Sequence, residues 1–473
     1  MNNTNISRRL MYGVVAAAVV AFAFALSAEA QTLSNSGGAL PSSKTLKTSI
    51  ANAYLFQNTM MDAYASGSTV RLTQSYSDGG LGATAFTYDN AVAIDAYLLR
   101  GGADNLTRAK VLGKGLIYAQ ATNFPFHDGR FAQAYFVNKA NPDGSGAFIM
   151  PAGAPFYFYS SSTGDQAWAG MALAQLYGRT GEQKYLTAAL KVANWIVANT
   201  YNTLGAGGYS FGTFINSSNQ SVPSPNGKST EGNIDAFAFF TMLADITDNG
   251  RADNNATWKS LAKHALVFVK AMYNPTGGYF YTGTLGDQIT INTSPIPEDC
   301  QTWSYLALLD NHYKQTIDWA LNNLEVTDTP SSPHSSLTGS ERITGVDFDT
   351  ASLTTPFADP NAVWLEGTSH TIAALIARII AGNESLSSRF ADLGTVEYFI
   401  ENCEKAQAEL GAGQTVNGKP IPVGEGLVAA TSVMDTGFGY TYGPSLHIGA
   451  TGWYLIAVQG GNPFQLGFET EER

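Results

Sequence analysis

Twelve helical segments with two different surface patterns alternate along this 473-residue chain. Segments such as 182–199 carry one apolar stripe and one charged face, which is typical of a helix at a protein surface. Segments such as 165–179 and 361–381 are apolar or small nearly all round and therefore belong in an interior. The interior segments begin near Asp89, Asp165, Glu231, Asp299, Glu366 and His447, at intervals of 66 to 81 residues. This alternation predicts an all-α fold of repeated hairpins, each pairing a surface helix with an interior helix.

The connections repeat with the same period. Links from an interior segment to the next surface segment are short, whereas those leading into interior segments are long: 67–87, 122–164, 200–230, 274–297, 325–360 and 411–443. Connections of this length usually carry function or their own ordered structure. Gly-Gly-Tyr pieces at 207–211 and 277–281 predict small strands there. If the hairpins form a ring, all long connections share one face, and that face is where we expect a site.

Six hairpins with six interior helices resemble the (α/α)6 toroid of the six-hairpin glycosidase superfamily. Three pieces carry the resemblance, at 229–235 (STEGNID), 363–368 (VWLEGT) and 450–454 (ATGWY), the last leading to 462–464 (NPF). The resemblance covers about 48–462 and implies one toroid domain, 48–473, with long loops and small β-hairpins at the N-termini of the interior helices. The superfamily contains hydrolases, lyases, epimerases and cyclases, so the fold alone does not assign the activity.

The N-terminus has the features of an export signal. Arg8 and Arg9 precede an apolar run, and Ala28-Glu29-Ala30 offers small residues for cleavage, which predicts a signal peptide at 1–30. Residues 7–11 also resemble a twin-arginine signal, so both export routes stay open. A flexible segment, 31–47, follows. No second long apolar run occurs, so we expect no membrane span in the mature chain and a periplasmic or extracellular location.

Composition narrows the class of ligand. The net charge of -12 disfavours binding to nucleic acid. Only 14% of the residues are charged and 12% are aromatic, which suits neutral, hydroxyl-rich ligands such as polysaccharides or oligosaccharides. The sequence does not decide whether Cys300 and Cys403 form a disulfide, and it leaves the oligomeric state undetermined.

Acidic residues lie in or beside the first turns of five interior helices. The catalytic candidates are Asp89, Asp165, Glu231 and Glu366. Acids are also favoured there as helix caps. If these acids lie close together at one end of the ring, however, some would be ionised and others protonated. Glycoside hydrolysis needs one acid in each state. Asp89 and Asp165 also resemble the acids that related toroid hydrolases place on their first and second interior helices.

Other polar and aromatic residues near the same helix starts are candidate substrate ligands, with core packing as the alternative for each aromatic ring. They are Tyr88, Trp168, Asp299, Trp303, Trp364, His370, Tyr440, Tyr442 and His447. The histidines are too widely spaced for a zinc site, and the pair Asp347 and Asp349 fits turn capping as well as calcium. We therefore predict neither a metal nor a cofactor.

Three functions remain at this point. The first is a secreted glycoside hydrolase that uses paired carboxylates as general acid and as base or nucleophile. The alternative is a non-catalytic glycan-binding or cell-surface protein on the same scaffold. The second alternative, a polysaccharide lyase, needs cationic groups to neutralise a uronate, and Lys228 is almost the only cation near an interior helix start.

Overall fold

The computed structural model describes residues 43–122, 126–137, 160–216, 218, 220–247 and 252–467. The predicted signal peptide, 1–30, and most of the predicted flexible segment, 31–47, lie outside these residues. Within them, the first helix begins at Ser43, earlier than the predicted start at 48. None of the described helices is both long and apolar enough to cross a membrane.

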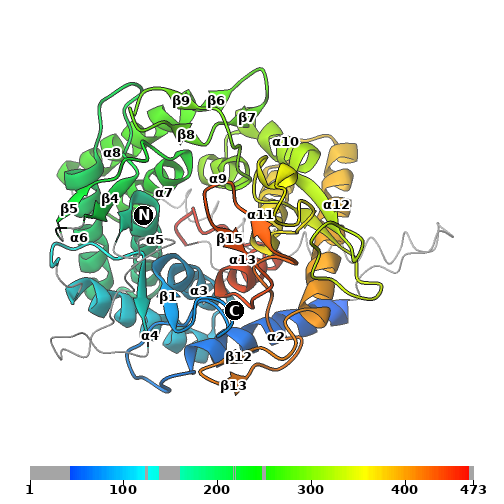
Figure 1. Cartoon of the computed structure of the whole chain (residues 1–473). Helices are drawn as coiled ribbons and strands as arrows, with labels where there is room; N and C mark the ends of the chain where they lie inside the picture. The colour runs from blue at the N-terminus through cyan, green and yellow to red at the C-terminus, as the bar shows by residue number, and fades with distance from the viewer. Residues whose placement is uncertain are drawn as a thin grey trace.

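Six helices form a ring in the middle of the molecule (Figure 1). These inner helices are α3 Thr87–Arg100, α5 Thr163–Thr180, α7 Thr230–Thr247, α9 Asp299–Leu308, α11 Leu365–Ala381 and α13 Ile448–Val458. Each packs against the inner helices before and after it, and α13 closes the ring against α3. The predicted interior segments and their order are therefore confirmed.

Six further helices surround this ring (Figure 1). These outer helices are α2 Ser43–Met61, α4 Gly102–Ala121, α6 Gln183–Thr200, α8 Ala252–Ala271, α10 Gln315–Leu324 and α12 Leu386–Glu409. Five of them pack against the inner helix that precedes them in the chain, whereas α2 packs against α13, the last helix. The Ser49 hydroxyl lies 2.7 Å from Tyr454 Oη and donates to Gln407 on α12, which ties the two ends of the chain together. The fold is the predicted (α/α)6 toroid.

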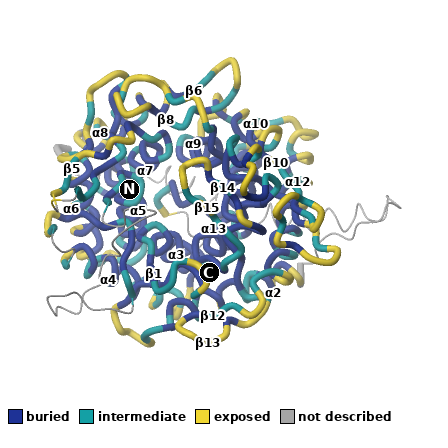
Figure 2. The backbone as a smooth tube through the Cα atoms, in the orientation of Figure 1, coloured by how far each residue is buried: buried dark blue, intermediate teal, exposed yellow. Residues whose placement is uncertain are grey.

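The two sequence patterns explain which helices face inward. In α3, every residue from Asp89 to Leu99 is buried, whereas α6 buries one stripe that includes Tyr185, Val192 and Ile196. Figure 2 shows the same contrast, with dark blue inner helices and exposed loops at the periphery. Small residues let the inner helices approach closely: a Cβ on Gly170 of α5 would lie 2.2 Å from the ring of Phe239 on α7.

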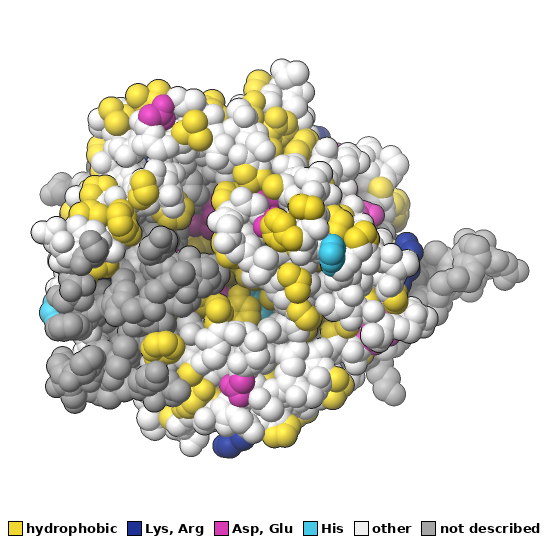
Figure 3. Space-filling view, viewed as in Figure 1, with side chains coloured by type: hydrophobic (Ala, Val, Ile, Leu, Met, Phe, Trp, Pro, Cys, Tyr) yellow, Lys and Arg dark blue, Asp and Glu magenta, His cyan; other side chains and the backbone are white. Residues whose placement is uncertain are grey.

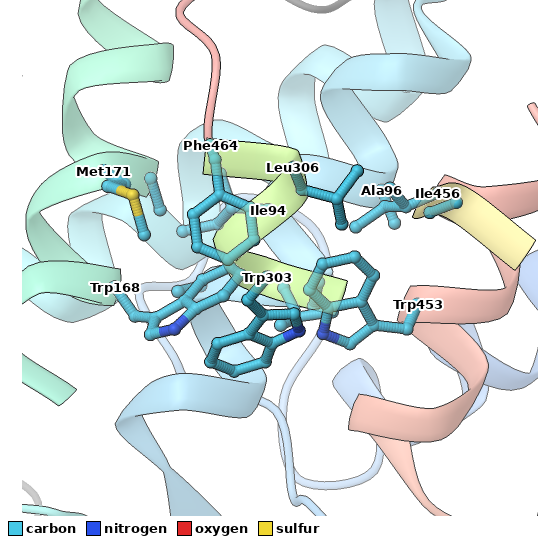
Figure 4. Packing of buried hydrophobic residues seen from close by; sticks show 14 of the residues in the cluster. Ile94, Ala96, Trp168, Met171, Trp303, Leu306, Trp453, Ile456 and Phe464 are labelled. Carbon is cyan, nitrogen blue, oxygen red and sulfur yellow. The ribbon is translucent and has the colours of Figure 1, made fainter. Parts of the chain in front are cut away.

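The C-terminal segment packs across the centre of the ring. Phe464 contacts the rings of Trp168 and Trp303, with centroids 5.3 and 5.4 Å apart, and also lies 6.3 Å from the ring of Trp453. Figure 4 shows these three indoles side by side next to Phe464. Asn462 donates to the carbonyl of Leu306 in the last turn of α9. This segment therefore reaches the C-terminal end of α9, and the long connections lie at the opposite end of the ring.

The long connections contain short antiparallel strand pairs, as predicted. They are β1 Thr84–Phe86 with β2 Ala134–Phe136, β3 Ser161–Ser162 with β4 Gly212–Ile215 and β5 Ser221–Pro223, β6 Tyr273–Asn274 with β7 Tyr279–Phe280, β8 Gly283–Thr284 with β9 Ile291–Asn292, β10 Glu325–Asp328 with β11 Ile343–Val346, β12 Thr415–Val416 with β13 Lys419–Pro420, and β14 Met434–Asp435 with β15 Thr441–Tyr442. The strand predicted at 277–281 is β7. The strand predicted at 207–211 is wrong, because Tyr209 forms only an isolated bridge with Tyr201 and the strand begins at Gly212.

Two short 3₁₀-helices, Asn311–Tyr313 and Ser352–Thr354, complete the described structure. Cys300 and Cys403 are both buried and carry free thiols. Asp349 Oδ1 accepts hydrogen bonds from the backbone N–H groups of Ala351 and Ser352, which is the turn-capping arrangement.

Candidate active site

The inner helices all begin at the end of the ring that carries the long connections, and their first turns bring the predicted acids together. The negative charges of Asp165, Asp299 and Glu366, added to burial, raise the pKa of Glu231 well above its usual range. Four helices therefore contribute carboxylates to one basin. In Figure 3, acidic side chains lie in a hollow near the middle of this face. The convergence predicted for Asp89, Asp165, Glu231, Asp299 and Glu366 is thus present.

Helix capping explains one of these acids. The α5 N-cap is Ser162, whose hydroxyl accepts from Asp165 N at 3.0 Å and donates to Asp165 Oδ2 at 2.7 Å. The N-cap positions of α3, α9 and α11 make no side-chain capping hydrogen bond. Asp89 and Glu366 instead bond to groups on other helices, so their places in first turns have a different cause.

One half of the basin is built around Glu366. This carboxylate lies between two imidazoles, 3.8 Å from His370 Nε2 and 3.6 Å from His447 Nδ1, and it accepts a hydrogen bond from the Tyr88 hydroxyl. Trp453 Nε1 in turn donates to Tyr88 Oη at 2.6 Å. Burial alone would raise the pKa of Glu366, but the neighbouring imidazoles of His370 and His447 and the hydrogen bond from Tyr88 lower it. Glu366 is therefore ionised.

Each imidazole is paired with a second carboxylate. His447 Nε2 lies 3.2 Å from Asp89 Oδ2, and His370 Nδ1 lies 3.2 Å from Glu298 Oε2. Burial lowers the pKa of both histidines, but these carboxylates outweigh burial, so both pKa values are raised above 6.5. The row Asp89–His447–Glu366–His370–Glu298 thus alternates negative and positive charges, which stabilises ionised carboxylates in a buried place.

In the other half of the basin the acids have raised pKa values and therefore keep their protons to higher pH. Burial and the charge of Asp89 raise the pKa of Asp165 to about 7. Burial and Glu298 raise the pKa of Asp299 to about 7, against the opposing charge of His370. Asp165 and Glu231 are also partly exposed, whereas Asp89 and Glu366 are nearly buried. Two acids with raised pKa values, Asp165 and Glu231, are therefore accessible, whereas Glu366, whose pKa is lowered, lies deeper.

The sequence analysis assigned no role to two acids of this site. Glu298 is fully buried and holds both His370 and the hydroxyl of Thr371, which donates to Glu298 Oε1 at 2.9 Å. Asp235 lies one turn after Glu231 on α7 and is fully buried, and its Oδ2 would lie 3.1 Å from a Cβ on Gly164 of α5. Burial and the charge of Glu231 raise its pKa well above the usual range. The four-residue spacing from Glu231 was the available signal, since it places both side chains on one helix face.

The predicted aromatic ligands fall into two groups. Trp168 and Trp303 are 1% and 3% exposed, and their faces are taken up by neighbouring rings, as the core-packing alternative expects. Trp364 is also buried, against Phe348. The second group, Tyr88, Tyr440 and Tyr442, lies at the basin and is partly exposed, and the charges of Glu231 and Asp299 add to burial in raising the pKa of Tyr440.

Cations are scarce around the basin. Lys228, the lysine nearest an inner helix start, is buried, and its Nζ donates to the carbonyls of Leu204 and Gly207 rather than to any acid. The described residues contain no group of three histidine, cysteine or acidic side chains arranged to hold a metal ion. Among the described residues, the positive charges that touch the basin acids are the imidazoles of His370 and His447.

Comparison with known proteins shows similarity of structure only. No protein-family profile and no curated protein sequence matches the chain. A family 76 glycoside hydrolase from a bovine Bacteroides thetaiotaomicron strain aligns with a TM-score of 0.55 and 11% identity, over 88% of this chain and 77% of the other. A GH76 α-mannanase from Bacteroides thetaiotaomicron gives 0.53 and 11%, over 87% and 95%. A glycosidase variant in complex with glucose gives 0.55 and 10%, over 88% and 98%. At these identities the likeness establishes the six-hairpin glycosidase-like fold.

Proposed function

We propose that the protein is a glycoside hydrolase in which Asp165 is the general acid and Asp89 is the general base or nucleophile. One observation carries the proposal: burial, with the charge of Asp89 added, raises the pKa of Asp165 to about 7, while Asp89 itself pairs with His447. A general acid needs a pKa near the working pH, and its partner needs a stable negative charge.

The reaction then follows from the two protonation states. Protonated Asp165 donates its proton to the glycosidic oxygen, so the leaving sugar departs as a neutral alcohol. Asp89 either removes a proton from the water that attacks the anomeric carbon or attacks that carbon itself, after which water hydrolyses the intermediate. Both routes consume one water and break the bond to the leaving oxygen. In the direct route the water proton ends on Asp89, and exchange with solvent deprotonates Asp89 and reprotonates Asp165; in the two-step route Asp165 takes the proton from the water.

The other acids support this pair. Glu366 carries a fixed negative charge close to the basin and can stabilise positive charge that develops on the sugar ring in the transition state. Burial and neighbouring acids also raise the pKa of Glu231, which is partly exposed like Asp165, so it is the second candidate for the proton donor. Tyr88, which bonds to Glu366 and to Trp453, holds that carboxylate in place.

Neutral glycans are the substrates that this site suits best. The basin offers no arginine or lysine, among the described residues, to neutralise a uronate, which disfavours lyase chemistry. One similar structure is an α-mannanase and another is a glycosidase bound to glucose, so α-linked mannooligosaccharides and glucooligosaccharides are the first substrates to test.

The test is release of new reducing ends from these oligosaccharides by the purified protein. Asp165→Asn and Asp89→Asn should each reduce the rate by at least about a hundredfold while glycan binding is retained. Glu231→Gln, assayed in parallel, decides which acid donates the proton. Binding without release by the wild-type protein at any pH would refute hydrolysis and leave the glycan-binding alternative. A product with the absorbance of an unsaturated uronate would instead identify a lyase.

Export is part of the proposal. It is supported by the sequence of residues 1–30, with its paired arginines and apolar run. N-terminal sequencing of the protein recovered from the periplasm or the medium should begin at Gln31. A protein found in the cytoplasm with residues 1–30 intact would refute it.

A further inference from the structure

A cleft of about 340 Å³ opens at the rim of the basin, between the loop that contains Tyr76 and the β14–β15 hairpin. Tyr76, Tyr440 and Tyr442 supply aromatic walls, and Thr441, Gly443 and Ser445 complete the side formed by the hairpin. Tyr76 belongs to none of the residues that the sequence singled out. The hairpin lies near the centre of the ring face (Figure 1), above the inner helices.

The lining of this cleft has a definite chemistry. It combines phenol rings and small hydroxyl side chains with the apolar side chain of Leu81 and the backbone of Gly80, and none of its lining residues carries a charged side chain. A flat ring can cover the apolar face of a pyranose, while hydroxyl groups bond to the sugar hydroxyls at its edge. An anionic ligand would find no counter-charge among the residues that line the cleft. The lining therefore fits a neutral sugar ring.

Two walls of the cleft contact residues of the basin. The ring of Tyr76 stacks on the imidazole of His447, with centroids 4.1 Å apart and an interplanar angle of 11°, and His447 bonds to Asp89. Tyr442 lies parallel to Trp364, with centroids 6.4 Å apart, and its pKa is raised by burial and by the charges of Glu366 and Asp89, among others. Tyr76, one wall of the cleft, is thus one ring away from the Asp89–His447 pair.

We propose that this rim cleft is a subsite for one neutral pyranose residue of the glycan, adjacent to the residue whose bond is cleaved. The inference rests on the proposed hydrolase function and adds a statement about the substrate: the protein acts on a chain of sugars rather than on a single sugar with a small leaving group. Tyr76 and Tyr442 would grip the neighbouring sugar and so align the bond to be cleaved with Asp165 and Asp89.

Filling the cleft is the sharpest test. A Cβ added at Gly443 meets no atom within 4 Å, and the backbone there is not left-handed, so Gly443→Leu places an alkyl group in the cleft without strain. Gly79→Leu is the matched control, because Gly79 has the same open surroundings on the facing loop but does not line the cleft. Both changes are made in the Asp165→Asn background, in which bound glycan is not turned over.

Binding is measured by calorimetry with methyl α-mannoside and methyl α-glucoside, and with α-linked mannooligosaccharides, maltooligosaccharides and cellooligosaccharides of two to six residues. The Asp165→Asn protein should bind the oligosaccharides of at least one series more tightly than the corresponding methyl glycoside. Gly443→Leu should weaken oligosaccharide binding roughly tenfold and leave the methyl glycoside within about twofold, because stacking of one sugar is worth about 1.4 kcal/mol. Gly79→Leu should change neither.

The subsite is refuted if Gly443→Leu behaves like Gly79→Leu for every chain length, if it weakens methyl glycoside and oligosaccharide equally, or if no oligosaccharide binds. Failure of the hydrolase proposal gives a different result. In that case oligosaccharides bind with the expected dependence on Gly443, yet the protein with Asp165 intact releases no reducing ends. Conversely, release that Gly443→Leu leaves unchanged for every length removes the subsite and keeps the hydrolase.

Discussion

Replacing Asp165 by asparagine should stabilise the protein at alkaline pH and leave its stability at acidic pH nearly unchanged. Burial and the charge of Asp89 raise the pKa of this carboxyl from 3.8 to about 7 in the folded chain. Between those two pH values the unfolded chain has lost the proton while the folded chain keeps it. The stability gained from keeping the proton is therefore complete below the unfolded pKa and is lost as the pH rises towards the folded pKa.

The magnitude follows from the difference between the two pKa values. Each pH unit is worth about 1.36 kcal/mol, so a gap of about three units gives an upper limit of about 4 kcal/mol. Because Asp165 is partly exposed, solvent screening reduces this limit, and we expect about 2 kcal/mol. Asparagine cannot ionise, and its amide oxygen can still accept the hydrogen bond from Ser162 that Asp165 Oδ2 accepts now. Asp165→Asn should therefore exceed the wild type by about 2 kcal/mol at about pH 8 and match it near pH 4.

Urea unfolding followed by tryptophan fluorescence at several pH values measures this difference. Asp287→Asn is the matched control: Asp287 is also bonded to a nearby hydroxyl, that of Thr290, but its hydrogen bonds lower its pKa, so it stays ionised throughout the range. Its effect on the free energy of unfolding should be the same at every pH. An Asp165→Asn effect that is equally independent of pH would show that Asp165 is not held protonated, and the assignment of the general acid would fail with it.

Three further outcomes test the site and the core. Glu298→Gln removes the carboxylate partner of His370, so the imidazole loses charge and the pKa of Glu366 rises. The acidic limb of the pH profile of kcat/KM should therefore move to higher pH. An unchanged profile would show that Glu298 does not position the His370–Glu366 pair. Gly449→Ala places a Cβ 2.8 Å from both Asp89 Oδ1 and Glu366 Oε2. Activity should therefore fall at least about tenfold, while the free energy of unfolding falls by no more than the about 1–3 kcal/mol expected of an overpacked side chain. Full activity would contradict the geometry. Phe464→Ala should lower the free energy of unfolding by about 3–5 kcal/mol, since the ring is 2% exposed and packs on Trp168, Trp303 and Trp453; a loss under about 1 kcal/mol would show that the segment does not pack there.

The sequence was sufficient for the fold because each helix class has its own residue pattern. A segment such as 165–179, which offers no polar face, can only be stable inside the molecule, and its predicted limits differ from those of α5 by two residues or fewer. The sequence also shows small residues such as Gly170, but it does not show which neighbouring side chain packs against them. The strand predicted at 207–211 was wrong because the backbone there turns: Gly207 and Gly208 both have positive φ.

The site was harder to predict because its chemistry depends on pairs from distant parts of the chain. The sequence placed Asp89 and His447 at helix starts but could not show that they touch, since 358 residues separate them. Glu298 and Asp299 are neighbours in sequence, and only the structure shows that Glu298 bonds to His370. Trp168 could not be assigned to core or ligand from its position, because both uses place an indole on an inner helix. Tyr76 lies in a loop without periodicity and gave no signal.

The first and last inner helices, which lie near the two ends of the chain, meet at the basin. Trp453 and His447 of the last inner helix complete the environment of Tyr88 and Asp89 on the first, across separations of 365 and 358 residues. Contacts between such remote partners tend to form late in folding. A truncated or half-folded copy therefore lacks the imidazole that bonds to Asp89 and the indole that bonds to Tyr88. The basin is thus complete only after both ends of the chain have folded together.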